Sequence, residues 1–125
     1  MSDILGIFLF LISAIIRILL APFIFIYGIF KASKNKSIGD YFKQIGLAND
    51  RWGNVVGQYA FNRLLSEPNG YKAGNGKETI SSYIGKNSEN GTLTKLGVFF
   101  YRILNLIDKN HCENSIDNTV DVWRK

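Results

Sequence analysis

Two short segments carry the side chains that acid–base or nucleophilic chemistry requires. The segment 78–82, Glu-Thr-Ile-Ser-Ser, places a carboxylate and three hydroxyls in consecutive turns of any helix it forms, and Lys86 follows closely. The segment 111–113 is His-Cys-Glu and contains the one histidine of the chain. A serine activated by a lysine, or a carboxylate paired with a histidine, is the chemistry that these residue types permit. The catalytic candidates are Glu78, Ser82, Lys86 and His111.

The same residues also have a structural interpretation. Glu78 and Thr79 can begin a helix, the serines can bond to neighbouring backbone groups, and Lys86 can interact with the helix dipole at its end. No strong catalytic motif accompanies these residues. We therefore favour a protein that is not an enzyme, and we keep a small membrane-tethered hydrolase or nuclease as an alternative.

We expect neither a metal ion nor a cofactor. His111, Cys112 and Glu113 are adjacent in sequence and cannot all face one ion, and the chain has no second histidine or cysteine to complete a tetrahedral set. The glycines of residues 70–76 lack the Gly-Lys-Ser/Thr ending of a phosphate-binding loop.

The most distinctive element lies at the N-terminus. From Ile4 to Phe30 the chain carries a single charge, Arg17. Roughly 20 apolar residues in a helix cross the hydrocarbon core of a bilayer, so this stretch is long enough to span it. A cleaved signal peptide would begin with a basic region and have a shorter apolar run, whereas here Asp3 leads. The other alternative, a buried core helix, would need more protein around it than this chain supplies.

The sequence thus predicts an all-α protein with one N-terminal transmembrane helix followed by a small helical domain. The predicted divisions are a membrane anchor with its basic flank at 1–36, the helical domain at 37–117 and a tail at 118–125. Because the domain is small and has one cysteine, we expect no disulfide to support it.

Charge predicts the orientation of the anchor and its lipid contacts. Cytoplasmic flanks of membrane helices are rich in Lys and Arg, so the N-terminus should face out and the domain should lie inside, at a host inner membrane or a virion membrane. The expected contacts to lipid headgroups are Lys31, Lys34 and Lys36. Each should contribute about 1 kcal/mol beside an anionic leaflet. The net charge of +5 is otherwise scattered, without interleaved aromatic residues, so we do not expect nucleic-acid binding.

Arg17 lies near the middle of the predicted span, where a cation costs at least about 2.5 kcal/mol. It shares one stripe of the helix with small residues, and such stripes let membrane helices pack closely. The predicted interface consists of Gly6, Ser13, Arg17, Ala21 and Gly28. We therefore expect a homo-oligomer or contact with another membrane protein. The alternative is that Arg17 extends alone to the interface, helped by a kink at Pro22.

Hydrophobic periodicity predicts helices in the remaining domain. A short helix should cover 37–45 and end at Gly46, and a longer one, capped by Asn49 or Asp50, should run to Leu65. Residues 66–77 are turn-forming and should make an exposed loop, followed by a short helix at 78–86. Several aromatic residues should supply most of the core, namely Tyr41, Phe42, Trp52, Tyr59, Phe61, Phe99 and Phe100.

A second apolar stretch covers residues 93–107. It is too short to cross a membrane and is interrupted by Lys95 and Arg102, so we interpret it as a core helix. A surface-lying amphipathic helix is the alternative, because the two cations share one face.

Three motifs together resemble a family. They are Asn-x-Leu-Leu at 62–65, Glu-Thr-x-Ser-Ser-x-x-Gly-Lys at 78–86 and His-Cys-x-x-Ser-Ile at 111–116. In this order they resemble the core of a group of small phage and prophage proteins that are commonly encoded near lysis and late genes. The resemblance covers residues 60–117 and implies a viral or prophage origin. It adds Asn62, Thr79, Ser81 and Cys112 to the candidate site.

The chain departs from that group at two places. Tyr83 stands where Arg is usual, and the loop at 66–77 replaces a short Gly-Gly-Asp-Pro turn. We expect a membrane-anchored phage or prophage accessory protein, acting in lysis or in a virion membrane. The alternatives are a membrane adaptor that binds a cytoplasmic or virion protein, and the hydrolase or nuclease named above.

Overall fold

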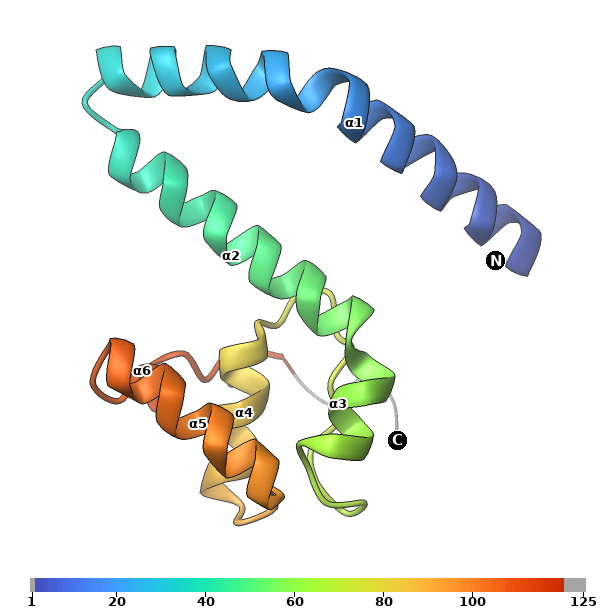
Figure 1. Cartoon of the computed structure of the whole chain (residues 1–125), viewed down its shortest axis with the longest axis vertical. Coiled ribbons are helices and arrows are strands. Elements are labelled where there is room, and N and C mark those ends of the chain that lie inside the picture. The colour runs from blue at the N-terminus through green and yellow to red at the C-terminus, as the bar shows by residue number, and fades with distance from the viewer. Residues whose placement is uncertain (1, 121–125) are drawn as a thin grey trace. The chain divides into compact units, whose positions relative to one another are not determined.

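The computed structural model describes residues 2–120 and confirms the all-α prediction (Figure 1). The described residues form helices α1 (Asp3–Lys34), α2 (Ile38–Val56), α3 (Gln58–Leu64), α4 (Ile80–Glu89), α5 (Lys95–Ile107) and α6 (His111–Asn114). The chain divides into two compact units, Met1–Gln44 and Ile45–Lys125, with the boundary inside α2.

The first unit is dominated by α1. Ser2 caps its N-terminus by accepting a hydrogen bond from the Leu5 amide at 3.3 Å. Of the helices in residues 2–120, α1 is the one long and apolar enough to cross a membrane, and none of its apolar stretch is buried. Pro22 lies inside the helix and cannot donate a backbone hydrogen bond, and Figure 1 shows α1 bending part-way along its length.

Within the same unit, the beginning of α2 packs against the end of α1. The Phe25 ring lies 6.3 Å from the Tyr41 ring and 5.9 Å from the Phe42 ring, between centroids. Gly28 has no side chain, and a Cβ there would overlap the Tyr41 hydroxyl. This glycine therefore makes room for an aromatic contact within one chain.

The predicted break at Gly46 is wrong, because α2 continues from Ile38 to Val56. A glycine inside a helix costs only about 1 kcal/mol relative to alanine, which the continuing backbone hydrogen bonds tolerate. The interruption comes instead at Gly57, which precedes α3. A Cβ on Gly57 would lie 2.5 Å from the Phe61 ring, so the missing side chain lets this ring pack against the turn.

The core of the second unit is centred on α4, and its buried hydrophobic residues are Leu65, Ala73, Tyr83, Ile84 and Cys112. Most of the predicted core aromatics are exposed, so that prediction is wrong. Phe61 does pack against the core, but Trp52, Tyr59 and Phe99 are all more than half exposed. The domain is too small to enclose so many large rings.

The interpretation of 93–107 as a core helix is also wrong in part. Leu104 and Tyr101 pack against the core, whereas Leu106 is 85% exposed. The helix approaches α3 through Gly97, where a Cβ would overlap the Leu65 carbonyl oxygen. The close approach uses a small residue, so the large apolar side chains remain on the outer face of α5.

The loop at 66–77 is less exposed than its composition predicts. Asn62 brackets Ala73, accepting its amide at 2.8 Å and donating to its carbonyl at 3.4 Å. Asn87 does the same for Tyr71, at 2.9 Å and 3.0 Å. Ser66 is 1% exposed and accepts a hydrogen bond from the Tyr83 hydroxyl. Side-chain amides thus satisfy backbone groups of the loop, in addition to the isolated β-bridge that pairs Ser66 with Leu93.

Candidate functional site

The start of α4 is held by its own N-cap residue, Thr79, and by two side chains of α2. Thr79 caps the helix by accepting the Ser82 amide at 3.1 Å, and Asp50 accepts the Ile80 amide at 2.8 Å. Asn54, which is fully buried, donates to the Glu78 carbonyl at 3.0 Å. These contacts fix the backbone at Glu78, one residue before the helix cap.

Three of the predicted catalytic residues meet in one buried network. The Glu78 carboxylate is 2.7 Å from the Lys86 ammonium and accepts the Ser82 hydroxyl at 2.6 Å, both through Oε1. Its Oε2 accepts the Tyr71 hydroxyl at 2.7 Å. Lys86 also donates to the Tyr71 hydroxyl at 3.2 Å and lies 4.4 Å from the centre of that ring. Both carboxylate oxygens therefore have partners, and Glu78 is 1% exposed.

The described end of the chain covers this network. The Asp117 amide donates to the Ser82 hydroxyl at 3.0 Å, and Lys86 donates to the Val120 carbonyl at 2.8 Å. Ser82 is fully buried. Glu78 and Ser82 are thus shielded from a substrate, whereas Tyr71 and Lys86 also line a polar cavity of about 340 Å³. The buried contacts fit the structural interpretation, with Glu78 rather than the helix dipole as the partner of Lys86. The rest of the predicted tail, residues 121–125, lies outside the described residues.

His111 belongs to a different cluster. Its Nε2 lies 3.1 Å from the Ser81 hydroxyl, and its Nδ1 lies 3.5 Å from an Asp108 carboxylate oxygen. Asn110, in the left-handed conformation at φ 57°, turns the chain between Asp108 and α6. The four predicted catalytic residues therefore do not form one site: three lie in the buried network and His111 pairs with Ser81.

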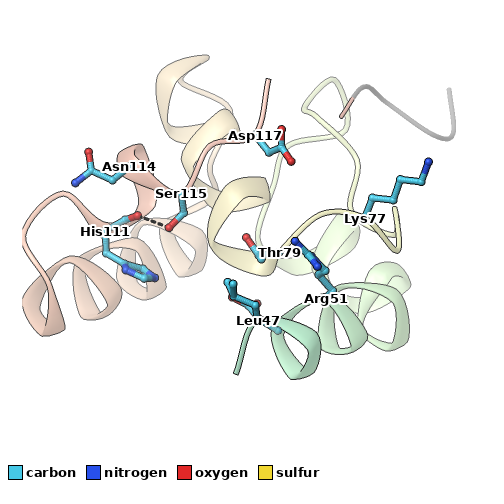
Figure 2. A pocket seen from close by; sticks show the side chains of 9 residues that line it. Leu47, Arg51, Lys77, Thr79, His111, Asn114, Ser115 and Asp117 are labelled. Atoms are coloured by element: carbon cyan, nitrogen blue, oxygen red, sulfur yellow. Dashed lines mark hydrogen bonds between the residues drawn. The ribbon is translucent and has the colours of Figure 1, made fainter. Parts of the chain in front are cut away.

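His111 opens onto a polar cavity of about 270 Å³. Figure 2 shows Arg51 and Lys77 across this cavity from His111, with Asp117 at another edge. Ser115 donates its hydroxyl to the His111 carbonyl at 2.6 Å, the dashed contact in Figure 2. The cavity combines an imidazole with cations and carboxylates, and such a lining favours a small polar or charged ligand.

The pKa values of two carboxylates in the cavity are shifted in opposite directions. Burial raises the pKa of Asp50, partly offset by its hydrogen bond to the Ile80 amide. Hydrogen bonds from the Thr119 hydroxyl and amide lower the pKa of Asp117. Sequence reasoning missed both acids as cavity residues. The residues around Asp50 are typical of a helix cap. Neither Asp50 nor Asp117 belongs to a sequence motif that indicates a position beside His111.

The residues added by the family resemblance have structural contacts. Asn62 brackets Ala73, Thr79 caps α4, and Ser81 contacts His111, as described above. Cys112 is fully buried, and its amide donates to the Asn105 side chain at 3.0 Å. Burial, with a smaller effect from the Asp50 charge, raises the pKa of the Cys112 thiol to about 11. The thiolate is therefore scarce at neutral pH, which disfavours Cys112 as a nucleophile.

The predicted membrane residues lie along α1 and just beyond it. The Ser13 hydroxyl donates to the Phe10 carbonyl of its own helix at 2.9 Å. Lys31 lies 5.9 Å from the centre of the Tyr27 ring, and Lys34 lies 4.8 Å from that of Phe30. Cations above aromatic rings at a helix end are typical of the bilayer interface.

Comparison of the chain with protein-family models, curated proteins and solved structures found no match. Function must therefore be inferred from the residues and their contacts. Among residues 2–120, no group of three or more His, Cys, Asp or Glu side chains is placed to hold a metal ion.

Proposed function

We propose that this protein is a single-pass membrane protein in which α1 anchors a small helical domain to the inner side of a membrane. The observation that carries the proposal is the exposure of α1, in which no residue of the apolar stretch is buried. Its 32 residues extend about 48 Å, which exceeds the roughly 30 Å of hydrocarbon and allows for tilt and the bend.

Charge supports an orientation with the N-terminus outside. Lys31 and Lys34 lie in the last turn of α1 and Lys36 follows it, whereas Asp3 lies in the first turn. The lysines would contact anionic headgroups of the cytoplasmic leaflet or of the inner face of a virion membrane.

The role that we propose is that of a phage or prophage accessory protein acting at this membrane, in lysis or as a virion membrane protein. The resemblance of residues 60–117 supports the origin, and the Arg17 stripe supports association in the bilayer with a second copy or another membrane protein. A membrane adaptor that binds a cytoplasmic or virion protein is the alternative within this class.

Membrane extraction tests the anchor. The full-length chain should remain in the pellet after alkaline carbonate treatment, and an Ile15→Lys, Leu19→Lys double variant should move to the supernatant, since each lysine costs about 2.5–3.5 kcal/mol at the bilayer centre. Arg17→Leu is the matched control and should stay in the pellet. Wild-type protein in the supernatant would contradict the proposal.

Induced expression with a membrane-potential dye tests the role. A lysis-related protein should dissipate the potential, and Arg17→Leu should reduce this effect while preserving insertion. A virion protein or adaptor would instead retain a specific partner in a detergent pull-down. If the membrane potential does not fall and no partner is recovered, the accessory role is contradicted.

A membrane-tethered hydrolase is the second candidate, and one observation favours it. Ser81, His111 and Asp108 are aligned in the order of a serine, a general base and an orienting carboxylate. Ser81 is only 3% exposed, which is why we rank this function second. His111→Ala and Ser81→Ala should abolish the host phenotype equally if it is correct, whereas the control Lys109→Ala, at an exposed position outside the cavity, should not. An intact phenotype in folded His111→Ala would remove the candidate.

A further inference from the structure

The outer face of α5 is apolar and exposed. Phe99 is 56%, Leu106 85% and Ile107 79% exposed, and Leu96, Phe100 and Ile103 extend the same face. Monomeric soluble proteins rarely display so many large apolar side chains together, and such surfaces indicate contact with a partner or a membrane.

The direction of this face is fixed by contacts on the opposite side of the helix. The Tyr101 hydroxyl and the Asn105 amide both bond to the Glu113 carboxylate, and Asn105 also accepts the Cys112 amide. Thr94 caps the helix by accepting the Gly97 amide at 3.1 Å. Because α5 cannot rotate without breaking these bonds, the exposed face is a stable property of the domain.

An apolar groove continues the face toward α3. It has a volume of about 410 Å³ and is lined only by apolar side chains, among them Leu64, Leu96, Phe100 and Ile103. Nothing in this groove can hydrogen-bond a polar ligand. Its occupant must therefore be hydrocarbon, from lipid or from apolar side chains.

Charge distinguishes between these occupants. On a helix of 3.6 residues per turn, Lys95 and Arg102 lie along one edge of the apolar face, next to Leu106. The sequence of α5 contains no acidic residue. An apolar face with cations at its border complements an interface that has acyl chains below and anionic headgroups above.

We propose that α5 lies in the headgroup region of the membrane, with its apolar face against the acyl chains and Lys95 and Arg102 at the phosphates. The inference rests on the proposed anchoring by α1, since the tether keeps the domain within reach of the bilayer. The protein then has two membrane contacts, one spanning and one interfacial.

Lipid contact can be measured on the full-length chain reconstituted in vesicles of phosphatidylcholine and phosphatidylglycerol. Leu106→Cys carries an NBD label on the apolar face, and Asn69→Cys, at an exposed position of the loop before α4, is the matched control. Native Cys112 can stay in place, because it is fully buried and should not react with the label. Quenching by doxyl-labelled lipid reports contact with acyl chains, and quenching by iodide reports contact with water.

We expect lipid quenching and protection from iodide at position 106, with the reverse at position 69. Equal iodide quenching at both positions would overturn the inference. Protection from both quenchers at position 106 would also overturn it, since protein, from a second copy or a partner, would then cover α5. Carbonate extraction of the same vesicles separates the two proposals: retained protein with a water-exposed α5 contradicts only the interfacial contact, and released protein contradicts the anchor.

The charge contribution has its own test. A Lys95→Gln, Arg102→Gln double variant should lower the ratio of lipid-bound to water-exposed α5 by roughly fivefold per cation removed in the anionic vesicles. In vesicles of phosphatidylcholine alone, the variant and the wild-type chain should behave alike. An unchanged ratio in anionic vesicles would overturn the assignment of these cations to phosphates.

Discussion

At the scale of the residue, the second unit depends on a buried carboxylate. Glu78 has a charged partner in Lys86 and hydroxyl donors in Ser82 and Tyr71. A buried ion is costly unless it is paired and hydrogen-bonded, and this one is both. The conspicuous cluster of reactive side chains is thus best explained as a support that joins α4 to the loop before it and to the described end of the chain.

Removing the charge of Glu78 tests this explanation. Glu78→Gln should lower the free energy of unfolding by roughly 3 kcal/mol, because Lys86 would keep a buried charge without its counter-ion. Urea denaturation followed by circular dichroism in detergent measures the change. Glu89→Gln, at an exposed position in the last turn of α4, is the control and should have little effect. Equal stability of the two variants would show that the pair does not support the fold.

The raised pKa of Asp50 predicts a pH dependence. The unfolded carboxyl titrates near 3.8, and the folded one titrates higher because of burial. Between these values the folded chain holds a proton that the unfolded chain has lost, so the contribution of Asp50 to stability falls as pH rises. Asp50→Asn should remove this fall while its oxygen still accepts the Ile80 amide.

The measurement is the difference in unfolding free energy between Asp50→Asn and the wild-type chain across the acidic range. The difference should grow in favour of the variant as pH rises from about 3.8. A difference that is constant with pH would contradict the effect of burial.

At the scale of the element, glycines decide where helices run and how closely they pack. Gly46 lies inside α2 with no atom near its missing Cβ, so it contributes no packing and does not end the helix. Gly85 lies inside α4, where a Cβ would be 2.5 Å from the Cys112 carbonyl oxygen and 2.8 Å from Ile116. The same residue type is dispensable in one helix and required in another.

The two glycines therefore make a matched pair of substitutions. Gly46→Ala should raise the free energy of unfolding by about 0.5–1 kcal/mol through the loss of glycine's backbone freedom in the unfolded chain. Gly85→Ala should lower it by roughly 1–3 kcal/mol, since the Cys112 backbone must move. Thermal unfolding in detergent measures both. Stabilisation by Gly85→Ala would contradict the close packing of α4 and α6.

At the scale of the whole molecule, we propose that an apolar helix and a small polar domain are joined across a membrane surface. The lysines at the end of α1 favour the proposed orientation, with the N-terminus outside. The outer face of α5 would give the domain a second contact with the membrane. Both contacts depend on apolar side chains that are exposed to solvent in α1 and in α5.

Reversing the charge asymmetry should reverse the orientation. A variant with Lys31, Lys34 and Lys36 changed to Gln and three lysines inserted after Met1 should place its N-terminus in the cytoplasm. Labelling of Ser2→Cys and Asn69→Cys by a membrane-impermeant maleimide in spheroplasts reports each side. In the original background Ser2→Cys should react and Asn69→Cys should not, and the variant should show the opposite. Identical labelling in both backgrounds would contradict the role of the lysines.

The sequence alone determined the all-α class, the long apolar helix and the association of Glu78, Ser82 and Lys86, because these depend on composition and on the spacing of residues along a helix. It could not place His111 with Ser81 or Asp50 at the start of α4, since each pair is 30 residues apart. It also could not place Tyr71 against Glu78, because an irregular loop with no periodic pattern joins them. Only the tertiary structure decided that the apolar face of α5 points outward. Gly97, Tyr101, Leu104 and Asn105 pack inward, and the small core has no room for the other large side chains of α5.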